Sequence, residues 1–214
     1  MIKQSLKLVL IKHSVPKVDP SRSAAAWQLS LEGIERCHRL STHLAESHPA
    51  ILVSSHEPKA GATADHLAER LVLPVMSVDG LEEQHRMTVP FLTHNAFQEA
   101  IRALFAHPSA LVFGEETADA ACARFSTVIY QLLDEHRGRS LLVVTHGTVI
   151  SLFLSRHTGL DPYSLWEQLG LPSFVLLDRQ TMHVDKYVMQ MSKIVEKGTR
   201  PQRSTSRLRS PALG

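Results

Sequence analysis

The chain has 214 residues, of which 43% are hydrophobic and 21% charged, and its formal net charge is +2. This length and composition suit one large globular α/β domain or two small ones. We expect neither a membrane span nor a signal peptide, because the apolar runs are far shorter than the roughly 18 to 20 residues of a span. Cys37 and Cys122 have no paired spacing, which favours a reducing cytoplasm over a disulfide framework.

The positive charge is concentrated at the C-terminal end. Five basic residues and no acidic ones lie in residues 197–214, so removing these five from +2 leaves about −3 for residues 1–196. A mildly acidic body argues against nucleic-acid binding. We predict a single domain over residues 1–196, followed by a basic tail whose Ser, Arg and Pro content is typical of disorder and which lacks apolar anchors for a membrane.

Apolar runs and helical periodicities alternate along the chain. Short apolar runs predict strands at six places: residues 6–11, 50–55, 75–78, 140–145, 174–178 and 183–188. Apolar stripes with helical spacing predict helices at residues 31–47, 58–71, 93–106 and 117–136, from just after Gly147, and at 163–168. Residues 14–30 and 79–92 have no clear period and are expected to be loops. Strands alternating with helices predict a three-layer α/β/α sandwich, with a mostly parallel central sheet and helices on both faces.

Two of these strands end in a histidine that is followed by a small residue. His13 precedes Ser14, and His146 precedes Gly147. In a parallel sheet the carboxyl ends of the strands form the edge where ligands bind, so both histidines are expected there. A helix begins just after His146, and its free N–H groups favour an anion. We therefore interpret His13 as a phosphate-accepting nucleophile with His146 opposite it.

The other histidines do not form a metal-binding motif. The chain contains 13 histidines but neither an HxH nor an HExxH sequence, and no His/Cys cluster has zinc-finger spacing. We expect most of them to be solvated surface residues, and we expect no metal site and no cofactor.

Six short motifs occur in the order found in a known family. They are Lys12-His13-Ser14, Leu29-Ser30-Leu31-Glu32-Gly33, the stretch from Ser54 to Ala64, Leu81-Glu82-Glu83, Gly114-Glu115-Glu116-Thr117 and Val144-Thr145-His146-Gly147. With these motifs the chain resembles the histidine phosphatase (phosphoglycerate mutase-like) superfamily over roughly residues 6–178. No single motif is specific, but six in the right order are fairly specific.

The resemblance implies a catalytic role for three residues. His13 would attack phosphorus to form a phosphohistidine, with its other ring nitrogen donating to a backbone carbonyl. His146 would contact the phosphoryl oxygens. Glu83 would protonate the leaving group and then activate water, which requires a pKa raised by partial burial. Motif register favours Glu83 over its neighbour Glu82, which stays an alternative.

The same resemblance implies that Lys12, Lys59 and the N–H of Gly147 bind phosphate, and two of these residues depart from the family pattern. The family has arginine at the positions of Lys12 and Lys59. A lysine keeps the positive charge but loses the planar fork of donors that grips phosphate in a bidentate manner. Arg86, three residues beyond Glu83, is a candidate to supply that contact.

These residues predict a cytoplasmic, metal-independent phosphomonoester hydrolase of the histidine acid phosphatase-like kind. Its ligand would be a small phosphorylated metabolite or inorganic phosphate. Two alternatives stay open: a phosphoglycerate mutase-type phosphotransferase, and a catalytically weak phospho-ligand-binding pseudoenzyme. Neither the substrate nor the oligomeric state can be read from the residues.

Overall fold

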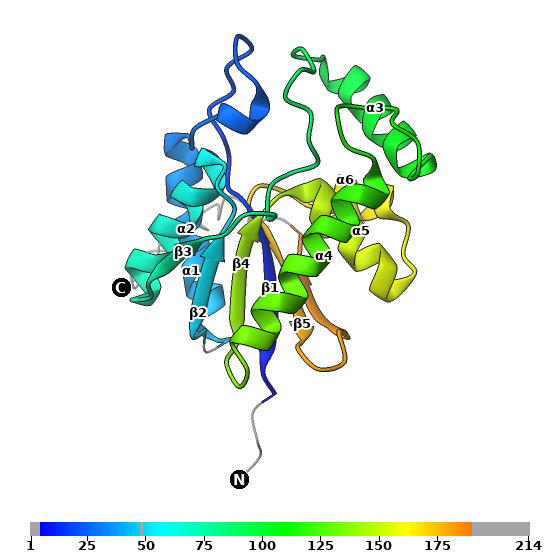
Figure 1. The fold of residues 1–214 in the computed structure, drawn as a ribbon. Coiled ribbons are helices and arrows are strands. Elements are labelled where there is room, and N and C mark those ends of the chain that lie inside the picture. Colours follow the sequence, from blue (N-terminus) through cyan, green and yellow to red (C-terminus); the bar gives the residue numbers. More distant parts are fainter. Residues whose placement is uncertain (1–4, 48, 190–214) are drawn as a thin grey trace, which may run out of the picture.

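A computed structural model describes residues 5–47 and 49–189 of the chain (Figure 1). Its centre is a six-stranded sheet with strand order β3-β2-β4-β1-β5-β6. The strands are β1 (Lys7–Lys12), β2 (Ile51–Ser54), β3 (Val75–Ser77), β4 (Leu141–Thr145), β5 (Ser173–Asp178) and β6 (Val184–Val188). The four strands from β3 to β1 pair in parallel, whereas β5 and β6 are added antiparallel at the other side. The sheet is therefore mostly parallel, as predicted.

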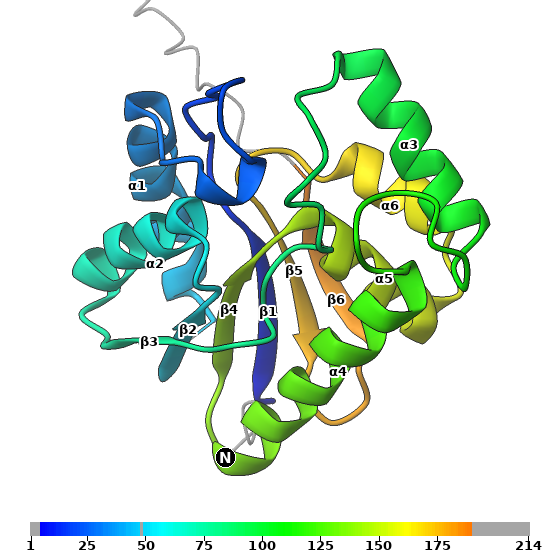
Figure 2. The same cartoon turned by 45° about the horizontal axis from the view of Figure 1, so that its top comes forward.

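The helices cover both faces of this sheet and give the predicted α/β/α sandwich. They are η1 (Ala24–Ala26), α1 (Leu31–Ala45), α2 (Pro58–Leu71), α3 (His94–Ala106), α4 (Ala118–Glu135), α5 (Gly147–Thr158) and α6 (Pro162–Gln168). In Figures 1 and 2, α1 and α2 lie on one side of the sheet, and α4, α5 and α6 lie on the other. The predicted elements are confirmed, and their bounds differ from the observed ones by no more than two residues.

The central strand β1 shows why its sequence is continuously apolar. Val9 and Ile11 belong to the core that includes residues of α1 and α2, whereas Leu8 and Leu10 belong to the core formed with α3 to α6. Successive side chains of a strand point to opposite faces, so a strand covered on both faces buries every residue. The strand needs polar residues only where it leaves the sheet, and this is where Lys12 and His13 lie.

The loop after β1 is tied to the first turn of α1. Ser30 caps this helix by accepting the N–H of Gly33 (3.0 Å), and its hydroxyl donates to the carbonyl of Val15 (2.8 Å). The Ser14 hydroxyl donates to the Gly33 carbonyl at 2.8 Å. A Cβ atom at position 33 would lie 2.4 Å from the Val15 oxygen, so only glycine permits this approach. These contacts join the segment that follows His13 to the start of α1.

Strand register places the two histidine-bearing ends next to each other. Lys12 is the partner of Thr145 in the parallel pair of β1 and β4, and the His13 N–H donates to the Thr145 carbonyl at 2.9 Å. His13 and His146 therefore leave the sheet side by side.

Among residues 5–47 and 49–189, no helix combines the length and apolar character needed to cross a membrane. The predicted basic tail, residues 197–214, lies outside the described residues.

Candidate active site

His13 is held in the form that a nucleophile needs. Its side chain is buried, and Nδ1 lies 2.8 Å from the backbone oxygen of Ser14. A carbonyl oxygen only accepts hydrogen bonds, so a neutral ring carries its proton on Nδ1 and leaves the Nε2 lone pair free. Burial, with the nearby charges of His146 and Lys59, holds the His13 pKa well below its usual value. The hydrogen bond expected for an attacking imidazole is thus present.

His146 lies against His13, with the two ring centroids 5.2 Å apart. It is fully buried as the N-cap residue of α5. Its Nε2 lies 2.9 Å from the Ser55 hydroxyl oxygen and 3.5 Å from a carboxylate oxygen of Glu57. Its Nδ1 is buried without a hydrogen-bond partner in the described part of the chain. Burial and the charge of Lys59 also hold the His146 pKa well below normal, so both rings are neutral near pH 7.

Lys12 reaches the site from the end of β1. Its ammonium donates to the Leu169 carbonyl at 2.6 Å. Burial lowers the Lys12 pKa to about 8, although the negative charge of Glu83 opposes this shift. A Cβ atom at position 147 would lie 3.2 Å from the Lys12 nitrogen. Gly147 therefore gives Lys12 the room to pass the start of α5, in addition to any role of its N–H.

Lys59 has a different partner, a carboxylate that sequence reasoning missed. Its ammonium forms a short ion pair with the buried Glu57 and donates to the Ala24 carbonyl at 2.7 Å. Glu57 also accepts the backbone N–H of Glu83 at 2.9 Å. Glu57 therefore joins Lys59 to the segment that carries Glu83. The available signal was an acidic residue two positions before a lysine that stands where the family has arginine.

Glu83 faces the histidine pair, but its ionisation differs from the expectation. Its carboxylate accepts the N–H groups of Gln84 (3.0 Å) and Thr148 (3.1 Å) and lies 3.3 Å from the Arg86 guanidinium. Burial by itself acts to raise the Glu83 pKa, but Arg86, His146 and these N–H donors together lower it to about 2. The expected raised pKa is therefore wrong for this state, because the carboxylate occupies the positive N-terminal end of α5.

Two neighbours of Glu83 have contrasting positions. The Glu82 carboxylate accepts the Gly80 N–H at 2.8 Å, lies 3.5 Å from Arg124 and makes no contact with His13 or His146. Arg86 lies at the site, where it contacts Glu83 and donates to the Gln84 side-chain oxygen at 3.2 Å. Of the two glutamates left open by the sequence, only Glu83 is close to the histidine pair.

The arrangement brings together all seven residues singled out from the sequence: Lys12, His13, Lys59, Glu83, Arg86, His146 and Gly147. Its charged side chains are three cations and two carboxylates, one of which, Glu57, was not expected. A neutral imidazole with a free lone pair, surrounded by cations at a helix N-terminus, can attack phosphorus and stabilise phosphoryl oxygens.

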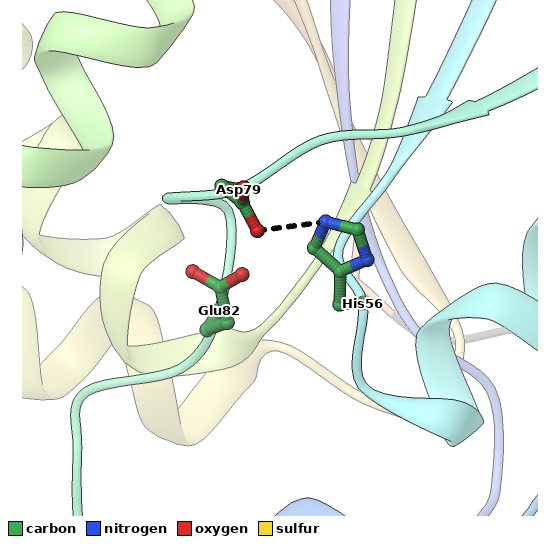
Figure 3. Close-up of side chains that lie close together, drawn as sticks. All are labelled: His56, Asp79 and Glu82. Carbon is green, nitrogen blue, oxygen red and sulfur yellow. Dashed lines mark ion pairs between the residues drawn. The ribbon is translucent and has the colours of Figure 1, made fainter.

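Three side chains that can bind metal ions, His56, Asp79 and Glu82, lie close together outside the histidine pair (Figure 3). His56 follows Ser55, and Asp79 and Glu82 precede Glu83. One ligand atom from each of His56, Asp79 and Glu82 lies within 4.8 Å of the other two, which makes them a group that could hold a metal ion. No spacing motif marks the cluster, because its members come from two separate loops.

Comparison with known proteins gives a consistent family and fold. The family model for the histidine phosphatase superfamily (branch 1) matches residues 19–184. This match begins after Lys12, His13 and Ser14, so it does not include the candidate nucleophile. A comparison with curated protein sequences gives no significant match.

Several solved structures share the fold at low sequence identity. A mycobacterial glucosyl-3-phosphoglycerate phosphatase has a TM-score of 0.68 at 20% identity, over 86% of this chain and 97% of that chain. A phosphoserine phosphatase from Entamoeba histolytica, in complex with 3-phosphoglyceric acid, has a TM-score of 0.69 at 16% identity, over 86% and 96%. The Bacillus stearothermophilus protein YhfR has a TM-score of 0.69 at 21% identity, over 88% and 98%. From the family match over most of its length, the chain belongs to branch 1 of the histidine phosphatase superfamily.

Proposed function

We propose that the protein is a metal-independent phosphomonoester hydrolase that acts through a phosphohistidine on His13. The observation that carries this proposal is the buried, neutral His13 ring, whose Nδ1 is held by the Ser14 carbonyl beside His146 and a group of cations. Packing alone does not account for three cations, Lys12, Lys59 and Arg86, around a buried histidine. Such an arrangement is suited to a dianionic phosphate monoester.

In the first step, Nε2 of His13 attacks phosphorus in line and the bond to the leaving alkoxide oxygen breaks. Lys12 and Lys59 compensate the charge on the phosphoryl oxygens, and the Gly147 N–H at the start of α5 adds a donor. The buried Nδ1 of His146, which has no partner among the described residues, is a further group for an oxygen to contact. These groups surround His13 before the substrate arrives, and a bound phosphate has to share Lys12 and Lys59 with the partners they have in the protein.

Glu83 has to gain a proton before it can serve as the acid. Arg86 and two N–H groups stabilise its charged form. A bound phosphate dianion would compete for Arg86 and place negative charge beside Glu83, and both effects raise its pKa. Glu83 then protonates the leaving alkoxide. As a carboxylate it next accepts a proton from the water that attacks phosphorus and releases His13.

The family match supports a proposal for the substrate class. We propose a small phosphorylated metabolite, with inorganic phosphate as the released product. Solved relatives include phosphatases named for glucosyl-3-phosphoglycerate and phosphoserine, and one holds inorganic phosphate.

We also propose that residues 1–196 form one domain and that the protein is located in the cytoplasm. Cys37 and Cys122, which are both buried and free, support this location.

One observation favours a second candidate, a phospho-ligand-binding protein with weak turnover. The Lys59 ammonium already has a buried carboxylate partner, Glu57. A ligand phosphate therefore has to share this cation, which weakens its hold on the transferring phosphoryl group relative to an unpaired cation. No contact in the described residues specifically favours a mutase over a hydrolase.

The experiment is a screen of phosphorylated metabolites for phosphate release, with His13→Ala and a His94→Ala control on the exposed start of α3. We expect His13→Ala to lower kcat by at least about 1,000-fold, since no other group can replace the nucleophile, and His94→Ala to have no effect. Wild-type protein quenched during turnover in alkaline detergent should carry phosphate on His13, because a phosphohistidine survives alkali but hydrolyses in acid. Full activity of His13→Ala would make the nucleophile assignment wrong. Phosphate binding without phosphohistidine would support the weak-turnover alternative, and isomerisation of a phosphoglycerate would indicate a mutase.

A further inference from the structure

We propose that His56, Asp79 and Glu82 bind a divalent transition-metal ion of the Zn²⁺ class, at a site distinct from the histidine pair. The three side chains converge from two loops, with Asp79 and Glu82 on one side and His56 on the other (Figure 3). Their ligand atoms all lie within 4.8 Å of one another. Ligand atoms around a tetrahedral zinc ion are about 3.4 Å apart, so small side-chain rotations would complete the set.

The imidazole of His56 is already oriented as a metal ligand would be. Its Nδ1 lies 2.8 Å from the Ser77 hydroxyl oxygen, and its Nε2 lies 2.9 Å from an Asp79 carboxylate oxygen. In metal sites, one ring nitrogen binds the ion while the other is fixed by a hydrogen bond, which sets the ring orientation. Ser77, the last residue of β3, supplies that fixed partner here. The nitrogen that faces the carboxylates donates its proton to Asp79 in the free protein, and it becomes the ligand when the ion displaces that proton.

Each of the two carboxylates has an oxygen atom that is available to bind a cation. Asp79 is exposed, so its side chain can turn toward the ion without breaking a packed contact. In Glu82, the Gly80 N–H and Arg124 both contact Oε2, and Oε1 makes no hydrogen bond or ion pair with the described residues. Arg124 lies 3.5 Å from Glu82 but is held more closely by Glu116, at 2.7 Å. Arg124 therefore does not neutralise Glu82 completely.

The donor set selects the class of ion. One imidazole nitrogen with two carboxylate oxygens suits zinc and similar first-row ions, whereas magnesium and calcium prefer oxygen donors alone. Three protein ligands leave at least one position for water. The surface position of Asp79 gives the ion direct access from solvent. An exposed ion pair between His56 and Asp79 contributes little to stability by itself, so it is not a strong competitor for the ion.

The consequence of metal binding is a connection between two segments of the candidate active site. His56 lies between Ser55, which contacts His146, and Glu57, which pairs with Lys59. Glu82 precedes Glu83, whose N–H already donates to Glu57. An ion bound by His56 and Glu82 would therefore hold the Glu83 segment against the start of α2. We expect slower amide hydrogen exchange in residues 78–84 when the ion is bound.

The test is a titration of the untagged full-length protein with Zn²⁺ in a phosphate-free buffer, followed by calorimetry, with Co²⁺ absorbance as a second probe. We expect one tight site in wild type and in the His94→Ala control. We expect binding weaker by at least about tenfold in His56→Ala and in Asp79→Asn, since each removes one of three ligands. Unchanged affinity in His56→Ala, or equal loss in His94→Ala, would overturn the proposal. The readout is binding alone, so it does not depend on phosphatase activity.

Discussion

Lys12 and Lys59 share one property: the family resemblance predicts arginine at both positions. Their surroundings differ. The Lys12 ammonium donates to a neutral carbonyl, that of Leu169, and burial lowers its pKa to about 8. The Lys59 ammonium forms a buried ion pair with Glu57. The same replacement thus leaves Lys12 with a neutral partner and a lowered pKa, whereas Lys59 is paired with a buried carboxylate.

This difference matters because phosphate binding depends on available positive charge rather than on the number of cations. A lysine with a neutral partner can turn toward a phosphate at little electrostatic cost. A lysine with a buried carboxylate has to divide its attraction between two anions, and the desolvated carboxylate cannot simply be left alone. The two lysines are therefore expected to respond differently to mutation and to pH.

The largest expected effect is a loss of stability when Lys59 is deprived of its carboxylate partner. Glu57→Gln leaves the Lys59 ammonium buried without its counter-charge, which should lower the free energy of unfolding by about 3 kcal/mol. Inorganic phosphate should restore much of this loss, because the ligand would supply the missing negative charge. Urea denaturation with and without phosphate measures both effects, and Glu69→Gln on the exposed face of α2 is the control. Equal destabilisation by both variants would mean that the ion pair is unimportant.

The next effect is a pH dependence that belongs to Lys12. Below pH 8 the Lys12 ammonium is charged, and above pH 8 it loses its proton, so phosphate affinity of the free protein should fall about tenfold per pH unit above 8. Lys12→Arg should remove this fall, since arginine stays protonated throughout the range. Calorimetric Kd values from pH 7 to 9.5 test the point. If Lys59→Arg removed the fall instead, the assignment to Lys12 would be wrong.

A smaller effect is expected from restoring the arginine fork at pH 7. Lys12→Arg should tighten phosphate binding by about fivefold, because the added donors can contact two phosphate oxygens at once. Lys59→Arg should change the affinity less, since Glu57 would accept part of the fork. Competition of inorganic phosphate against a generic phosphate monoester gives both inhibition constants. Weaker binding in both variants would indicate a pocket shaped for lysine.

The smallest expected effect is an uptake of protons by Glu83 when phosphate binds at pH 6. At this pH Lys12 is protonated and does not contribute, and Glu83, with a pKa of about 2, is ionised in the free protein. Phosphate binding should raise the Glu83 pKa and cause uptake of a fraction of a proton. Calorimetry in buffers of different ionisation enthalpy measures this uptake, and Glu83→Gln provides the reference, since proton changes of phosphate itself are common to both. Identical uptake in the two proteins would remove Glu83 as the acid.

The fold could be predicted from the sequence because its signals are local. The β1 and β4 segments read as strands from their apolar runs, and the helices read from apolar residues at helical spacing, so their positions agree with the structure within two residues. The rule that parallel strands present their carboxyl ends at one edge then placed His13 near His146. The family motifs added Lys12, Lys59 and Glu83, each of which lies at the site.

Only the tertiary structure decided how these groups act on one another. Whether Glu83 is protonated depends on Arg86 and on the N–H of Thr148, which belongs to a helix far along the chain. Electrostatic interactions of buried groups depend on distance and burial, and neither can be read from spacing in the sequence. By itself the sequence predicted the sheet and the helices, which the structure confirms, and it supplied the candidates for the reacting groups. Folding determined their charge states, because it alone sets which carboxylate lies beside which cation.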